Sequence, residues 1–81
     1  MMNKYKLCLY YFDSCPFCVK VLNYLQKSKI TILKRNILTD PEAKETLRRI
    51  GGKTQVPCLF IDEKPLYESD DIIQWLEEHI K

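Results

Sequence analysis

Two cysteines separated by two residues, Cys15 and Cys18, lie near the start of this chain in the sequence Cys-Pro-Phe-Cys. The apolar and aromatic segment 6–12 before them is predicted to be a buried strand. From Pro16 to about Ser28, apolar residues recur at spacings of three and four, which predicts an amphipathic helix. A CxxC pair that ends a strand and opens a helix is typical of a thiol–disulfide redox site.

The start of a helix gives the two cysteines different expected roles. The thiolate is the form that attacks a disulfide, and free N–H groups and the helix dipole favour a negative sulfur. We therefore expect Cys15 to be the exposed nucleophile and Cys18, one turn inside, to be the shielded resolving thiol. Asp13 would oppose a thiolate and is expected to face solvent.

Half of a zinc site is the main structural alternative for a CxxC pair. Zinc needs a second pair of ligands at short spacing, whereas Cys8, Cys58 and His79 are scattered along the chain. The redox interpretation is therefore favoured, and no metal is expected. Cys8 and Cys58 are interpreted as buried small apolar residues, with Cys58, directly after Pro57, the nearer to the redox pair.

The rest of the sequence predicts the elements that would position this pair. Strands are expected at 31–37, 56–61 and 65–67, with a turn at 62–64. A second helix is expected to begin at Asp40 and Pro41 and to end at Gly51-Gly52, and a third to be capped by Ser69 or Asp70. The inward faces of the first and third helices are predicted to carry Phe17, Val21, Leu22 and Leu25, and Ile72, Ile73, Leu76 and Ile80.

The resulting order is β-α-β-α-β-β-α. A right-handed crossover would make the first two strands parallel, and a hairpin would make the last two antiparallel.

Composition narrows the class of protein further. Eighty-one residues with 46% hydrophobic content indicate one globular domain spanning 1–81. The net charge of +2 comes from 13 basic and 11 acidic residues, which argues against nucleic-acid binding. No apolar run reaches the roughly 20 residues of a membrane span, and no signal segment is evident. We expect a cytoplasmic monomer, and in a reducing compartment a CxxC pair is more often catalytic than structural.

Three motifs in order, Cys15–Cys18, Thr54–Pro57 and Glu68–Asp71, resemble the glutaredoxins, and the similarity covers nearly the whole chain. The resemblance implies an α/β, thioredoxin-like fold with a four-stranded mixed sheet, three helices and helices on both faces. It also implies dithiol chemistry. Cluster binding is associated mainly with glutaredoxins that have one cysteine and a Gly-Phe-Ser sequence, and this chain has neither feature.

The same resemblance implies a glutathione site in the loop before the third strand. Pro57 would be in the cis form, and the backbone of Val56 would pair with the cysteinyl unit of glutathione like an added strand. Lys53 matches a basic position that could pair with the glycine carboxylate, and Gln55 is a further candidate contact. Glutathione would be a reducing co-substrate and not a permanently bound cofactor.

The start of the third helix completes the implied site. Ser69 and the free N–H groups would hold the γ-glutamyl carboxylate, and Asp70 its amino group. Lys20 could assist. Two departures stand out: Phe12 replaces a lysine found in many glutaredoxins, and Tyr67-Glu68 replaces Gly-Gly. The sequence around Glu68 is similar instead to the N-terminal domain of glutathione transferases, which also bind glutathione.

The sequence therefore predicts a glutathione-dependent thiol–disulfide oxidoreductase that reduces protein disulfides or glutathione mixed disulfides. One alternative is a redoxin that thioredoxin reductase reduces, which Lys53, Ser69 and Asp70 disfavour. The other is a noncatalytic module that binds glutathione or a metal, in which Cys15 would react as an ordinary thiol.

Overall fold

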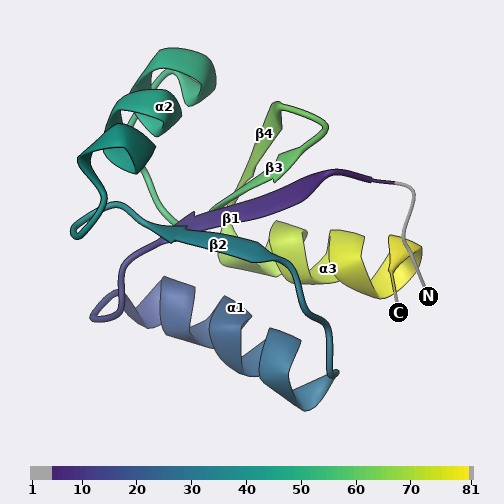
Figure 1. Cartoon of the computed structure of the whole chain (residues 1–81). Helices are drawn as coiled ribbons and strands as arrows, with labels where there is room; N and C mark the ends of the chain where they lie inside the picture. The colour runs from purple at the N-terminus through teal and green to yellow at the C-terminus, as the bar shows by residue number, and fades with distance from the viewer. Residues whose placement is uncertain (1–4, 81) are drawn as a thin grey trace.

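The computed structural model describes residues 5–80 and contains four strands and three helices in the predicted order (Figure 1). The elements along the chain are β1 (Leu7–Tyr11), α1 (Pro16–Lys27), β2 (Leu33–Asn36), α2 (Pro41–Gly51), β3 (Cys58–Ile61), β4 (Lys64–Tyr67) and α3 (Ser69–His79). The first three strands are shorter than predicted. The largest consequence is that Val56 and Pro57 lie in the loop before β3 and not in the strand.

The strands form one mixed sheet in the order β2-β1-β3-β4. β1 pairs in parallel with β2 and antiparallel with β3, and β3 pairs antiparallel with β4. The β3–β4 turn is shorter than predicted, because Asp62 and Glu63 both adopt positive φ and Lys64 already belongs to β4. The parallel and antiparallel pairings both follow the prediction.

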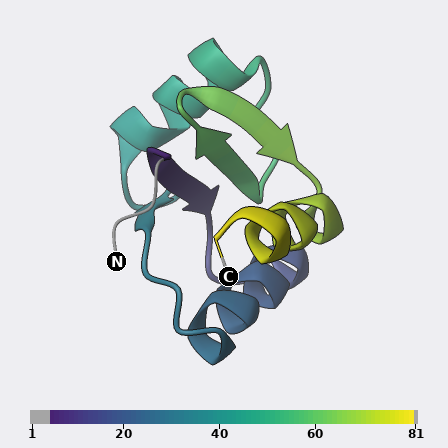
Figure 2. The same cartoon turned by 90° about the vertical axis from the view of Figure 1, so that its right-hand side faces the viewer.

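Helices cover both faces of the sheet, with α1 and α3 on one face and α2 on the other (Figures 1 and 2). Successive side chains of a strand point to opposite faces, so β1 contributes to two cores. The core under α1 and α3 contains Leu7, Leu9, Val21, Leu25, Leu59, Ile72 and Leu76. The core under α2 contains Tyr10, Ile37, Ala43, Leu47, Cys58 and Phe60.

The predicted inward faces of the helices are correct except at Phe17. Val21 and Leu25 are buried, but Phe17 is 63% exposed. Side chains of an α-helix lean toward its N-terminus, so a residue in the first turn extends past the end of the helix instead of over the sheet. Phe17 is therefore a surface residue at the N-terminal end of α1.

The ends of α2 follow the prediction. The Asp40 carboxylate accepts hydrogen bonds from the N–H groups of Glu42 (3.1 Å) and Ala43 (3.2 Å), and it pairs with the Arg35 guanidinium at 3.1 Å. Gly52 ends the helix with a φ of 88°, a conformation that glycine adopts without steric cost. Within residues 5–80, no helix is long and apolar enough to span a membrane.

Candidate active site

The two cysteines of the CxxC pair lie where the sequence predicts, at the turn from β1 into α1. Cys15 is the N-cap of α1, Pro16 occupies the first helical position, and the Val19 N–H donates to the Cys15 carbonyl at 2.9 Å. The Cys15 N–H donates to the Phe12 carbonyl at 3.3 Å, which folds the turn back toward the end of β1. Asp13 is exposed, as expected.

The expectation that Cys15 is an exposed residue is wrong, because it retains only 8% of its accessible surface. The tight turn back to Phe12 holds it against the protein. Cys18 is fully buried, as predicted for a shielded thiol. Burial, reinforced by the hydrogen bond and charge of Cys15, raises the pKa of Cys18 to about 12, against a lowering effect of the Phe12 backbone. Cys18 therefore keeps its proton at neutral pH.

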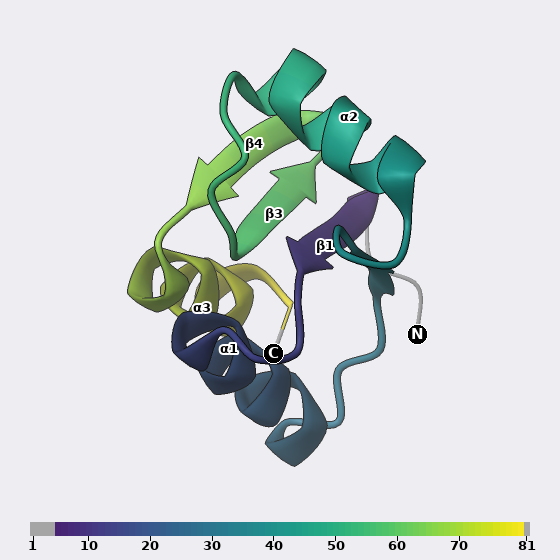
Figure 3. The same ribbon diagram turned by 90° about the vertical axis from the view of Figure 1, so that its left-hand side faces the viewer.

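A pocket of about 210 Å³ lies beside this turn, and residues from all three sequence motifs line it. It is lined by Phe17, Gln55, Val56, Pro57, Glu68 and Ser69. Figure 3 shows how the starts of α1 and α3 lie side by side below the loop that leads into β3. The Val56–Pro57 peptide bond is cis, as the resemblance implies.

The start of α3 differs from the prediction by one or two residues. Glu68, and not Ser69 or Asp70, is the N-cap, and its side chain makes no capping hydrogen bond. Its positive φ of 76° turns the chain from β4 directly into the helix, so Ser69 and Asp70 lie in the first turn. Ser69 is 6% exposed and faces the pocket.

Charged and polar side chains pair across the rim of the pocket. The Lys20 ammonium forms an ion pair with the Asp70 carboxylate, which ties α1 to α3. Gln55 Nε2 donates to Glu68 Oε2 at 3.1 Å, so the loop before β3 is tied to the start of α3. Lys53 is exposed, and its ammonium lies 4.5 Å from the centre of the Tyr67 ring.

The other two cysteines lie on the α2 face of the sheet. Cys58 is buried in the core under α2, as predicted for a small apolar residue. The reason is the alternation of strand side chains, which turns Cys58 to the α2 face. Burial raises the pKa of Cys58 to about 11. Cys8 is only half-buried on the same face, and burial also raises the pKa of its thiol.

Residues 5–80 contain no group of three or more His, Cys, Asp or Glu side chains placed to hold a metal ion.

Two pocket residues were missed in the sequence analysis. Helical spacing places Phe17 in the core, although its position inside the CxxC motif marks it as a neighbour of the two cysteines. Glu68 belongs to the third motif and to the transferase-like segment but receives no role in the site, although it directly precedes Ser69, whose ligand-binding role the resemblance implies.

A four-stranded mixed sheet with a CxxC pair at the turn from β1 to α1, and a cis proline before β3, defines a dithiol protein of the thioredoxin-like fold. The glutaredoxin family model matches residues 7–66. A probable glutaredoxin of Synechocystis sp. is 34% identical over 68 residues, covering 83% of this chain and 77% of that protein. Glutaredoxin 1 of Rickettsia prowazekii is 30% identical over 82 residues, covering 95% and 86%. The chain belongs to the glutaredoxin family, and this membership supports a thiol oxidoreductase role.

Solved structures agree with this assignment. Oxidized glutaredoxin 2 from Chlamydomonas reinhardtii superposes with a TM-score of 0.65 and 28% identity, covering 94% of this chain and 75% of that one. A glutathione S-transferase from the Antarctic clam Laternula elliptica superposes with a TM-score of 0.70 and 30% identity. That match covers 90% of this chain but 34% of the transferase. Both kinds of relative that the motifs resemble therefore share this fold.

Proposed function

We propose that the protein is a glutathione-dependent thiol–disulfide oxidoreductase that reduces protein disulfides and glutathione mixed disulfides through Cys15 and Cys18. The observation that carries the proposal is the pocket of about 210 Å³, because its walls come from the CxxC helix, the loop before β3 and the start of α3. A peptide thiol bound there would lie beside the redox pair.

The pocket and the residues beside it offer a partner for each part of glutathione. In the proposed complex, the backbone of Val56 pairs with the cysteinyl unit in the manner of an added strand. Ser69 and the free N–H groups of α3 hold the γ-glutamyl carboxylate. Asp70, which already pairs with Lys20, takes the amino group.

The opposite end of glutathione meets the loop before β3. Lys53, exposed at the end of α2, supplies the positive charge for the glycine carboxylate. The Gln55 side chain, already directed toward Glu68, borders the pocket between these two ends.

The proposed reaction on a glutathionylated protein proceeds in two exchanges. The Cys15 thiolate attacks the glutathione sulfur, a Cys15–glutathione disulfide forms, and the protein thiolate leaves and takes up a proton. The thiolate of a second glutathione then attacks the bound glutathione sulfur, releasing oxidised glutathione and restoring the Cys15 thiolate. In sum, one mixed disulfide and one glutathione become one protein thiol and one glutathione disulfide.

Reduction of a protein disulfide uses Cys18 as well. After Cys15 has formed a mixed disulfide with the protein, Cys18 loses its proton and attacks the Cys15 sulfur. The second protein thiol is released, and a Cys15–Cys18 disulfide forms, which two glutathione molecules then reduce.

Single-cysteine variants test the assignment of roles. We expect Cys15→Ser to abolish turnover of a glutathionylated peptide in an assay coupled to glutathione reductase and NADPH. Cys18→Ser should retain this activity but lose reduction of a protein disulfide. Cys8→Ser, which removes a thiol of the core under α2, is the matched control and should behave as wild type.

Full activity of Cys15→Ser would refute the proposal. Turnover with thioredoxin reductase in place of glutathione and its reductase would instead identify a different electron donor.

We also propose that the chain acts as a single-domain monomer in a reducing cytoplasm. Size-exclusion chromatography with light scattering should give the mass of one chain, 9.7 kDa, at every concentration, and twice that mass would contradict the monomeric state.

A further inference from the structure

Tyr67, the last residue of β4, makes several contacts that the reaction does not use. Its hydroxyl donates to the Gly51 carbonyl at 2.9 Å and lies 3.4 Å from the Lys53 carbonyl oxygen. Its ring lies under the Lys53 ammonium at 4.5 Å from the ring centre. The Tyr67 side chain therefore contacts both the backbone and the Lys53 ammonium of the segment that leads from α2 into the loop before β3.

The absence of a side chain at Gly51 leaves room for the Tyr67 hydroxyl. A Cβ atom at this position would lie 2.5 Å from the Tyr67 hydroxyl oxygen, too close for any real side chain. The next atoms, Leu47 Cδ1 at 3.4 Å and Tyr67 Cζ at 3.6 Å, are at ordinary contact distance. Because φ of Gly51 is not positive, the backbone does not require glycine here. The space that the Tyr67 hydroxyl occupies is the physical reason for this glycine.

The Tyr67 hydroxyl also remains a donor over the whole working range of pH. Burial, with the neighbouring Cys58, raises the pKa of Tyr67 to about 12. The hydrogen bond to Gly51 is therefore not interrupted by ionisation.

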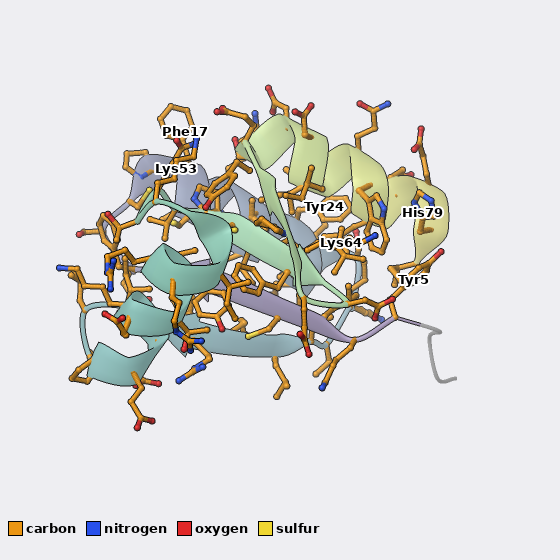
Figure 4. The ribbon with its side chains drawn as sticks, turned by 90° about the horizontal axis from the view of Figure 1, so that it is seen from above. Tyr5, Phe17, Tyr24, Lys53, Lys64 and His79 are labelled. Carbon is orange, nitrogen blue, oxygen red and sulfur yellow. The ribbon has the colours of Figure 1, made fainter. Side chains whose placement is uncertain are left out.

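We propose that Tyr67 is a positioning residue of the glutathione site, in which its hydroxyl holds the chain after α2 and its ring places the Lys53 ammonium for the glycine carboxylate. This inference rests on the proposed function, because it assigns Lys53 to glutathione. Lys53 and Phe17, which lines the pocket, lie at the same end of the molecule, opposite Tyr5 and His79 (Figure 4). Tyr67 contacts neither cysteine of the redox pair, so it acts on binding and not on the exchange steps.

The hydroxyl is tested by Tyr67→Phe, with Tyr24→Phe as the matched control. Tyr24 also donates a hydroxyl hydrogen bond, to Glu77 Oε1 at 2.6 Å, but it joins α1 to α3 away from the pocket. We expect Tyr67→Phe to raise the KM for glutathione about two- to tenfold, the effect of one lost hydrogen bond, with kcat unchanged. A KM equal to that of Tyr24→Phe would overturn the role of the hydroxyl.

The ring is tested by comparing Tyr67→Leu with Tyr67→Phe. The leucine variant loses the cation–π contact, so its KM for glutathione should be about threefold higher than that of the phenylalanine variant. In a Lys53→Met background this ratio should fall to one, because no cation remains to be placed. An unchanged ratio in that background would show that the ring does not act through Lys53.

The fit between Gly51 and Tyr67 gives a test that needs no activity. We expect Gly51→Ala to lower the melting temperature of the wild type, because its Cβ meets the Tyr67 hydroxyl. In a Tyr67→Phe background the same change should raise the melting temperature, since alanine favours the helix over glycine. Destabilisation by Gly51→Ala in both backgrounds would refute the contact.

These outcomes separate the inference from the function on which it rests. If the wild type shows no turnover that depends on glutathione, the proposed function fails, and this inference fails with it. If the wild type turns over with glutathione while Tyr67→Phe and Tyr67→Leu match the control, only the role of Tyr67 is refuted.

Discussion

The most informative prediction concerns the protonation of Cys18 once Cys15 is removed. In a Cys15→Ala variant, Cys18 loses the hydrogen bond and the charge of its neighbour, both of which raise its pKa. Burial is the larger cause of the raised pKa, and it remains because Cys18 is fully buried in α1. The variant should therefore contain a Cys18 thiol that is still much less acidic than an ordinary cysteine.

The expected magnitude follows from the difference between the two pKa values. A rise from 9.0 to about 12 lowers the thiolate fraction at neutral pH about a thousandfold, because each unit of pKa is a factor of ten. Only the thiolate is alkylated at an appreciable rate. Iodoacetamide at pH 7 should therefore modify Cys18 in the folded variant at least a few hundredfold more slowly than in the same variant unfolded in guanidinium.

Peptide mapping by mass spectrometry measures each cysteine separately in this assay. Cys58, whose pKa is about 11, provides an internal comparison that is also fully buried and should be slow. Modification of folded Cys18 at a rate within tenfold of the unfolded reference would refute the reasoning. It would mean that the start of α1 opens to solvent and that burial does not keep the Cys18 thiol protonated.

Two further predictions concern the stability of the elements around the site. The Arg35 hydrogen bond lowers the pKa of Asp40 below 3.8, so ionised Asp40 stabilises the fold above that pH, and the contribution is lost as the pH falls through the folded-state pKa. The melting-temperature difference between wild type and Asp40→Asn should be constant from pH 7 to about 5 and shrink below pH 4. A difference that stays constant from pH 5 down to pH 2.5 would contradict this. Glu68→Gly should be about 1 kcal/mol more stable than Glu68→Ala, because both variants lose the hydrogen bond from Gln55 and only glycine accepts the φ of 76° without strain. Equal melting temperatures for the two variants would contradict this.

Much of the fold could be predicted because its signals are local. The Asp40 cap, Pro41 at the first helical position and the glycine that ends α2 each act within one turn of the chain. The alternation from strand to helix around Cys15 is equally local, and it placed the redox pair correctly. These features depend on backbone hydrogen bonds between near neighbours, so the residue types alone determine them.

The errors arose where a residue meets partners distant in sequence. Phe17 follows the apolar spacing of α1, but only the position of the helix end relative to the sheet leaves it exposed. Glu68 is the N-cap of α3 because β4 ends at Tyr67 and the chain turns into the helix at the next residue. The residue types near Glu68 do not specify this direction of the chain.

The sequence by itself therefore determined the order of elements, the dithiol pair and the resemblance that points to glutathione. Tertiary structure alone decided how the pocket and its surroundings are built, because their contacts join residues far apart in the chain. The ion pair of Lys20 with Asp70 spans 50 positions, and the hydrogen bond from Tyr67 to Gly51 spans 16. Such contacts form only when the sheet and helices pack, and their geometry follows from that packing and not from local residue preference.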